Sequence, residues 1–256
     1  MKKLWSILLA AFIAATFATA TSAQSDKILM GTPVVDGVLD EIYLQSVAVP
    51  LGEPFHTTGD SLESDAKATA YLLYDAEKLY VCVVVSDNDI LMREKDYIES
   101  SDNPWENDVV EIWVDEDMLG SKTKISLDSE ATKLFGTPDP YGLVEQTKGA
   151  VTKGDGTYTV EFAIPLLEPG VEGKTYGFSL QVNDLFPDSH VVALGSQAPE
   201  EYVFGGPVVM PEPEPEPELD ETAGATPPAP ATFDFTPAAF MLLIAASAAL
   251  AARKKR

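Results

Sequence analysis

The 256-residue sequence predicts an all-β domain, an antiparallel β-sandwich of jelly-roll-like form, and three observations support this prediction. Apolar and polar residues alternate over short runs such as 158–164 and 174–183, as in strands that have one buried face. Turn-forming residues separate these runs about every ten positions. Few stretches carry the 3.6-residue period of a long helix. Short strands, frequent turns and little helix together are typical of a sandwich.

The first half of the domain is predicted to contain a turn, a short helix and a hairpin. Asp36-Gly37 lies between apolar residues and predicts a tight turn, and a short helix is expected over residues 40–44. Residues 51–65 are rich in Gly, Pro, Ser and Thr and predict a loop. The strands predicted over 67–74 and 79–85 are separated by a four-residue turn and therefore form a hairpin.

The strand over residues 79–85 is apolar on both faces, which predicts a central, buried position. It contains Cys82, the only cysteine of the chain, so no intrachain disulfide can form. We therefore expect Cys82 to lie in the core.

The second half begins with residues 90–104, which have no regular period and predict a long loop of the kind that often carries binding residues. Lys153-Gly154-Asp155-Gly156 predicts a hairpin turn, and Pro165 is expected to end the strand before it. The strands predicted in this half span residues 108–114, 122–127, 147–152, 158–164 and 174–183.

The two ends of the chain predict export and anchoring. A basic start precedes an apolar run and the small residues Thr21-Ser22-Ala23, which predicts a signal peptide over 1–23; an uncleaved anchor is the alternative. Residues 235–252 form an uncharged 18-residue run, long enough as a helix (about 27 Å) to cross a membrane. The expected organisation is a signal peptide (1–23), a sandwich domain (24–210), a Pro/Glu-rich stalk (211–234), a transmembrane helix (235–252) and a basic cytoplasmic end (253–256). The domain is thus expected to be secreted and displayed at the cell surface.

Charge and composition exclude several classes of function. The formal net charge is −24, which argues against nucleic acid or anionic lipid as the partner. The two histidines, His56 and His190, are too few for a typical histidine zinc site. Glu111 and Asp115 are four residues apart on one strand, about 13 Å, which is too far for a glycosidase carboxylate pair. We therefore expect no enzymatic activity in this domain.

The segment from Trp105 to Asp115 points to sugar binding. In a strand over 108–114, Val110, Ile112 and Val114 share the face that suits a core, and Glu111 and Trp113 share the other face. Trp105 lies on the loop leading in. An apolar ring beside a hydrogen-bonding carboxylate suits a sugar, which has one C–H face and a rim of hydroxyls; the alternative is that both indoles merely pack.

Five segments in order resemble carbohydrate-binding module family 9, a DOMON-like β-sandwich domain. The resemblance implies a sandwich that binds sugars, is often appended to xylanases and related hydrolases, and contains structural calcium. It covers nearly all of residues 28–210. The resembling segments are residues 35–41, 70–75 with 79–81, 105–115, 158–165 and 178–184.

The resemblance also implies a site, a slot between two tryptophans with a glutamate after the first. Trp105 and Glu111 match the first tryptophan and the glutamate. The second tryptophan is missing, and in residues 190–206 only Tyr202 and Phe204 offer a facing ring. The residues expected to bind carbohydrate are Trp105, Glu111, Trp113, Asn183 and Tyr202, with Lys124 and Lys133 as further donors to hydroxyls.

Calcium is the one cofactor expected, and no organic cofactor is. Asp87-Asn88-Asp89 and the pair Asp36 and Asp40 offer the hard oxygen ligands that calcium prefers, and Asp87 and Asp89 are the expected ligands. Neither group matches an EF-hand loop.

The expected function is non-catalytic binding of poly- or oligosaccharides of the xylan and cellulose type in support of carbohydrate catabolism. Glycoside hydrolases or other surface proteins are the expected partners. Two alternatives stay open. One is a protein-interaction or scaffold module with a degenerate sugar site. The other is a haem-binding electron-transfer domain, for which Met92 and His190 are the suggestive ligands.

Overall fold

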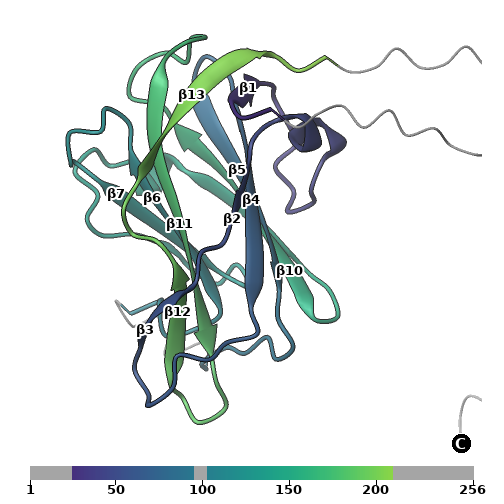
Figure 1. Cartoon of the computed structure of the whole chain (residues 1–256), viewed down its shortest axis with the longest axis vertical. Coiled ribbons are helices and arrows are strands. Elements are labelled where there is room, and N and C mark those ends of the chain that lie inside the picture. The colour runs from purple at the N-terminus through teal and green to yellow at the C-terminus, as the bar shows by residue number, and fades with distance from the viewer. Residues whose placement is uncertain (1–24, 95–102, 210–256) are drawn as a thin grey trace, which may run out of the picture. The chain divides into compact units, whose positions relative to one another are not determined.

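The structure, a computed structural model, describes residues 25–94 and 103–209 (Figure 1). This part of the chain is mostly β-sheet and contains two short 3-10 helices, η1 (Glu41–Gln45) and η2 (Val144–Gln146). It contains no helix long and apolar enough to cross a membrane. The predicted signal peptide, stalk, transmembrane helix and basic end lie outside the described residues.

One sheet is built around the hairpin that the sequence predicts. Its strands follow the order β9–β10–β5–β4, all antiparallel. The short strands β1 and β2 both pair with β4, β1 in parallel. The bounds are β1 (Ile28–Met30), β2 (Ala48–Pro50), β4 (Lys67–Tyr74), β5 (Lys78–Ser86), β9 (Lys148–Lys153) and β10 (Thr157–Pro165).

The other sheet follows the order β8–β7–β6–β11, and β12 and β13 both pair with the far edge of β11. The edge strand β3 pairs with β12. In Figure 1 β13 runs from beside β11 to beside β1, with which it pairs in parallel, so it joins the two sheets. The bounds are β3 (Pro54–Thr57), β6 (Val109–Asp115), β7 (Thr123–Asp128), β8 (Leu134–Phe135), β11 (Thr175–Leu185), β12 (Val191–Gly195) and β13 (Glu200–Pro207).

A single large core lies between the sheets, as expected for a sandwich. Alternate residues of β5 and β6 enter it, including Val81, Val83, Val110 and Ile112, all without exposed surface. The ring of Phe204 joins the sheets there, because it stacks on Tyr74 with ring centroids 4.0 Å apart and on Tyr176 at 5.7 Å.

The other face of β5 is buried as well, which explains its apolar sequence. Tyr80 and Cys82 form a second cluster with Tyr43 of η1, and Cys82 has no exposed surface, so the prediction that it is buried is confirmed. Burial also raises the pKa of the Cys82 thiol. The segment over this face is held by Glu161, which accepts hydrogen bonds from the Asp36 N–H (2.9 Å), the Gly37 N–H (3.0 Å) and the Tyr43 hydroxyl (2.9 Å).

The seven predicted strands are confirmed to within two residues at each end, and the short helix over 40–44 is confirmed as η1. The prediction of loop throughout 51–65 is wrong for β3, an edge strand whose Pro54 and Thr57 resemble loop residues. The strands β12 and β13 were not predicted. The first is apolar on both faces over only five residues, and the second contains two glycines and a proline.

Candidate functional site

The predicted binding segment lies on the outer face of the second sheet. Val110, Ile112 and Val114 of β6 are in the core, so strand alternation directs Glu111 and Trp113 outward, as predicted. Glu111 lies opposite Gln181 of β11 and Ser126 of β7. The next strand, β12, places Ala193 opposite Asn183. Ser126, Glu111 and Gln181 therefore form one polar row across three neighbouring strands, and Asn183 and Ala193 lie in the next row on the same face.

A pocket of about 270 Å³ opens above this row. Four of the five residues expected to bind carbohydrate line it, together with Lys124. The full lining consists of His56, Thr58, Trp105, Glu111, Trp113, Lys124, Gln181, Asn183, Val191, Ala193 and Gln197.

Glu111 is buried at the pocket floor and is held from three directions. Its Oε1 accepts hydrogen bonds from Lys124 Nζ (3.0 Å) and Ser126 Oγ (3.1 Å), and its Oε2 accepts one from Gln181 Nε2 (2.8 Å). The Lys124 ammonium compensates the carboxylate charge. A carboxylate has about four lone-pair sites, and these contacts use three of them, which leaves one site on Oε2 without a hydrogen bond.

Gln181 extends this set of contacts along the sheet. Its Nε2 also donates to Asn183 Oδ1 (2.7 Å), and its Oε1 accepts from Gln197 Nε2 (2.7 Å). Each of these side chains is thereby fixed in one orientation. Lys122 Nζ in turn donates to the Gln197 carbonyl (3.1 Å).

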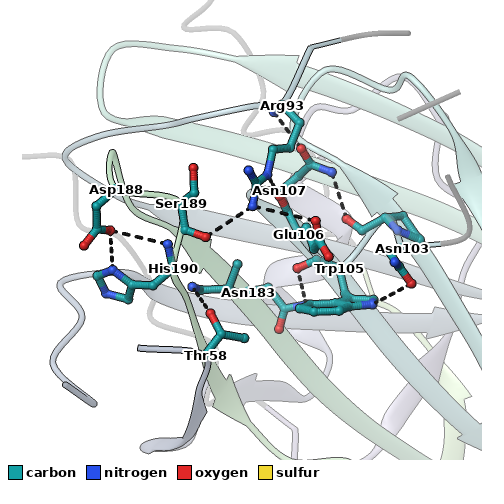
Figure 2. Close-up of polar contacts among 12 residues, drawn as sticks. Thr58, Arg93, Asn103, Trp105, Glu106, Asn107, Asn183, Asp188, Ser189 and His190 are labelled. Atoms are coloured by element: carbon teal, nitrogen blue, oxygen red, sulfur yellow. Dashed lines mark hydrogen bonds and ion pairs between the residues drawn. The ribbon is translucent and has the colours of Figure 1, made fainter. Parts of the chain in front are cut away.

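Trp105 is half-buried, and hydrogen bonds to the backbone around it hold it in place. Asn183 Nδ2 donates to the Trp105 carbonyl (3.1 Å), and Asn107, which is buried, donates to the Pro104 carbonyl (3.0 Å). Arg93 spans the loops around it, because its backbone N–H donates to Asn107 Oδ1 (2.8 Å) and its guanidinium to the Ser189 carbonyl (3.2 Å). Figure 2 shows these contacts around the Trp105 indole. The indole therefore rests on a fixed backbone at the edge of the pocket.

Two expected residues do not reach the pocket. Tyr202 meets Phe178 edge-on, with ring centroids 6.2 Å apart, and lines a separate pocket beside β2, so it does not face Trp105. Lys133 lies over the ring of Phe135 at 4.9 Å. Phe204, the other candidate for a facing ring, is in the core because β13 crosses between the sheets.

Sequence reasoning missed His56, Thr58, Gln181 and Gln197. For Gln181 a signal existed, because it shares the polar face of β11 with Asn183. His56 and Thr58 lay in a predicted loop, and Gln197 lies in the turn between two strands that were not predicted. No pattern in the sequence placed these three residues beside Trp105.

Three buried carboxylates form a second candidate site. Oxygen atoms of Asp87, Asp108 and Asp184 all lie within 4.8 Å of one another. Asp108 accepts hydrogen bonds from the backbone N–H groups of Leu185 (2.7 Å) and Leu91. Burial, reinforced by the neighbouring carboxylates, raises the pKa of Asp108 to about 8 and that of Asp184 to about 6.

Of the two expected calcium ligands, Asp87 belongs to this cluster and Asp89 does not. Asp89 is exposed, and its backbone N–H donates to Asp87 Oδ1 (3.0 Å). Asp36 and Asp40 serve local turns instead, each accepting a backbone N–H at 3.0 Å.

The donor set fits a calcium ion, which prefers six to eight oxygen ligands. Tyr158 is buried, and its hydroxyl has no hydrogen-bond partner within the described part of the chain. Burial and the charges of Asp108, Asp87 and Asp184 raise its pKa, so it lies within their electrostatic reach. Three buried carboxylates and an unpartnered hydroxyl are the surroundings that a divalent cation would stabilise.

One of the two haem ligands suggested by the sequence, His190, has contacts within its own turn. His190 stacks on Phe186, with ring centroids 4.2 Å apart, and its Nδ1 contacts Asp188. The imidazole of His190 therefore makes its contacts with residues of the same turn.

Comparisons with known proteins identify the family of the domain and support its fold. The family model described as "Carbohydrate family 9 binding domain-like" matches residues 35–201. Endo-1,4-beta-xylanase A of Thermotoga maritima is 35% identical over 169 residues, which are 60% of this chain and 14% of that protein. Exoglucanase XynX of Acetivibrio thermocellus is 32% identical over 167 residues, or 63% of this chain and 14% of that protein. The chain thus spans about one seventh of the length of these relatives.

Among solved structures, a family 9 carbohydrate-binding module of Caldicellulosiruptor kristjanssonii in complex with cellotriose is similar, with a TM-score of 0.55 and 19% identity. The match covers 72% of this chain and 96% of that one, and it shows a shared fold. Because the family model covers about two thirds of the chain, the chain belongs to the carbohydrate family 9 binding domain-like family.

Proposed function

We propose that the domain binds poly- or oligosaccharides of the xylan and cellulose type in the pocket between Trp105 and β3. The observation that carries the proposal is that the half-buried Trp105 indole and three oriented polar side chains, Glu111, Gln181 and Asn183, line one pocket. Membership of the family, and the cellotriose bound by the similar module, support this ligand class.

Each part of the pocket suits one part of a sugar. The C–H face of a pyranose packs on the Trp105 indole, which removes apolar surface from water. The free lone pair of Glu111 accepts a hydroxyl proton in a charge-assisted hydrogen bond. Lys124 and the exposed side chain of Gln197 donate to hydroxyl oxygens. Trp113 forms part of the floor.

We expect the affinity to be modest, with dissociation constants from micromolar to millimolar, or about −8 to −4 kcal/mol. The pocket is open and small, and one tryptophan instead of two faces the sugar.

The domain is proposed to bind without cleaving. Glu111 is neutralised by Lys124 and is hydrogen-bonded by Ser126 and Gln181, so it does not act as a free base. Asp115, the next carboxylate along the same face of β6, is about 13 Å away. Cleavage would be left to glycoside hydrolases acting alongside.

Asp87, Asp108 and Asp184 would hold a structural calcium ion. A bound calcium ion would compensate two of the three negative charges and tie the ends of β5, β6 and β11 together. Asp108 and Asp184 adjoin the pocket segments in sequence, because they follow Trp105 by three residues and Asn183 by one. The ion would therefore stabilise the base of the sugar site.

We also propose display at the cell surface. The apolar runs over residues 4–21 and 235–252, the Pro/Glu-rich stalk and the basic final four residues support this arrangement.

Retention on polysaccharide tests the function. The full chain, purified in a detergent without a sugar headgroup, should be retarded in gels containing soluble xylan or cellulose derivatives. Trp105→Ala should migrate as in a gel without polysaccharide. Equal mobility of the wild-type chain with and without every polysaccharide would refute sugar binding, and capture of a surface protein instead would favour the scaffold alternative.

A further inference from the structure

The pocket has a second wall that the sequence did not reveal. Trp105 forms one side, and the opposite side is formed by His56 of β3 and by Thr58, the residue that follows β3. Pairing between β3 and β12 places His56 opposite Ala193, and Ala193 in turn lies opposite Asn183 of β11. His56 is therefore two strands away from Asn183 and lies on the same face of the sheet, and Asn183 contacts the Trp105 backbone.

The strand spacing leaves room for one sugar ring between the positions of Asn183 and His56. Adjacent strands are about 4.8 Å apart, so His56 and Asn183 are separated by about 10 Å across the sheet. Asn183 Nδ2 donates to the Trp105 carbonyl (3.1 Å), which places the Trp105 backbone beside Asn183. A pyranose between two flat rings needs roughly 8 Å between them, twice the 3.5–4.0 Å contact distance of carbon atoms.

The residues between the two walls leave the space open. Ala193 is the side chain midway between Asn183 and His56, and it extends no further than its methyl group. Figure 2 labels Trp105, Asn183 and Thr58, three of the residues that line this pocket. Thr58 is held in place because its Oγ1 accepts from the Val191 N–H (2.9 Å) and its N–H donates to the Val191 carbonyl (3.0 Å).

The His56 side chain is free to meet a ligand. It is exposed, and its imidazole makes no hydrogen bond within the described part of the chain. Apart from the two indoles, His56 is the only residue with a ring among those that line the pocket in the described structure. An imidazole offers a flat face for stacking and two nitrogen atoms for hydroxyls.

We propose that His56 is a sugar-binding residue, the wall that faces Trp105 across the slot. This inference rests on the proposed function. It gives the edge strand β3 a role in sugar recognition. The second wall of the slot is then an imidazole, which is smaller than an indole and has polar nitrogen atoms at its edge.

Calorimetric titration of the full chain with cellotriose, in the same kind of detergent, tests the proposal with three variants. His56→Ala should weaken binding roughly 5- to 10-fold, because one stacking face is lost. His56→Trp should restore or strengthen binding, since an indole offers a larger face. Phe55→Ala is the matched control, because Phe55 is an exposed ring (45%) on the neighbouring position of β3 and does not line the pocket. Its affinity should stay within twofold of the wild type.

The outcomes separate the two proposals. Unchanged affinity in His56→Ala, alongside lost binding in Trp105→Ala, would overturn the role of His56 and leave sugar binding intact. A decrease in Phe55→Ala as large as that in His56→Ala would also overturn it, because the effect would then belong to the strand. Absence of binding by the wild-type chain to cellotriose and to the polysaccharides would instead remove the proposed function itself.

Discussion

Replacing Glu111 with glutamine should weaken sugar binding by about 5- to 30-fold. The substitution keeps the shape of the side chain but removes the charge that strengthens its hydrogen bond to a sugar hydroxyl. Hydrogen bonds to charged groups contribute about 1.5–3 kcal/mol and neutral ones about 0.5–1.5 kcal/mol, so the expected loss is about 1–2 kcal/mol.

The same change should also destabilise the fold, for a reason visible in the contacts. If the new amide keeps its oxygen toward Lys124 and Ser126, its NH₂ group faces Gln181 Nε2, which is itself a donor. Gln181 cannot simply flip, because its Nε2 also donates to Asn183 and its Oε1 accepts from Gln197. One buried donor is left without an acceptor, which costs about 1–3 kcal/mol.

Glu116→Gln is the matched control for Glu111→Gln. Glu116 is likewise buried (7% exposed side chain) and accepts three hydrogen bonds, from Lys174 Nζ (2.6 Å) and the N–H groups of Leu167 (2.7 Å) and Glu168 (3.0 Å). It does not line the pocket. Calorimetric titration and denaturant unfolding of both variants should show similar losses of stability, with a loss of affinity in Glu111→Gln alone. Equal affinities for the two variants would refute the role of the Glu111 carboxylate in recognition.

Three further perturbations test the cation site, the pH response and the core. Calcium at about 100 times its dissociation constant should raise the unfolding temperature by roughly 5–10 °C, since this excess adds about 2.7 kcal/mol. Scanning fluorimetry with calcium and with a chelator would measure this rise in unfolding temperature, and Asp108→Asn should abolish it. An unfolding temperature of the wild type that does not change with calcium would contradict the cation site. Burial raises the pKa of Glu161 above its ordinary 4.5, so the folded protein keeps a proton that the unfolded chain loses. The stability that this proton contributes is fully present below pH 4.5 and is lost as the pH rises through the pKa of Glu161 in the folded protein. Glu161→Gln should therefore reduce the change of the urea unfolding midpoint with pH in this range. The same pH dependence in the variant and the wild type would contradict a raised pKa at Glu161. Phe204→Ala should lower the free energy of unfolding in guanidinium by about 3–5 kcal/mol, because its ring stacks between the two sheets. Leu119→Ala, at an 81% exposed position, should lower it by less than about 0.5 kcal/mol. Similar losses for the two variants would show that the stacked rings do not join the sheets.

Strand alternation made much of the fold and half of the site predictable. In β6 the apolar residues occupy one face and Glu111 and Trp113 the other, so one strand prediction located both core and pocket floor. The polar face of β11 likewise carried Asn183. Both strands are long and patterned, and such segments are the ones that periodicity identifies.

The rest of the pocket depends on pairing between segments far apart in the chain. His56 and Asn183 are brought together only because β3 pairs with β12 and β12 with β11, and a local pattern contains no information on such partners. Tyr202 was expected to face Trp105 because of its position in the sequence alone. β13 instead directs Tyr202 toward Phe178 and a different pocket.

The acidic cluster shows the same limit. Asp87 and Asp89 are two residues apart and looked like partners, yet the three carboxylates that converge come from the ends of β5, β6 and β11. Asp108 sits where an alternating strand would place a core residue, and that position was its only signal. A buried aspartate at the start of an apolar strand is expensive without a partner, and this cost is a usable hint of a cation site.

The most direct test of the account is a calorimetric titration of the full chain with cellotriose, compared with Trp105→Ala under the same conditions. The account predicts one site per chain with a dissociation constant between micromolar and millimolar for the wild type, and at least a tenfold weaker value for the variant. No heat of binding from the wild type, or the same constant for both proteins, would contradict the claim that this pocket is a sugar site.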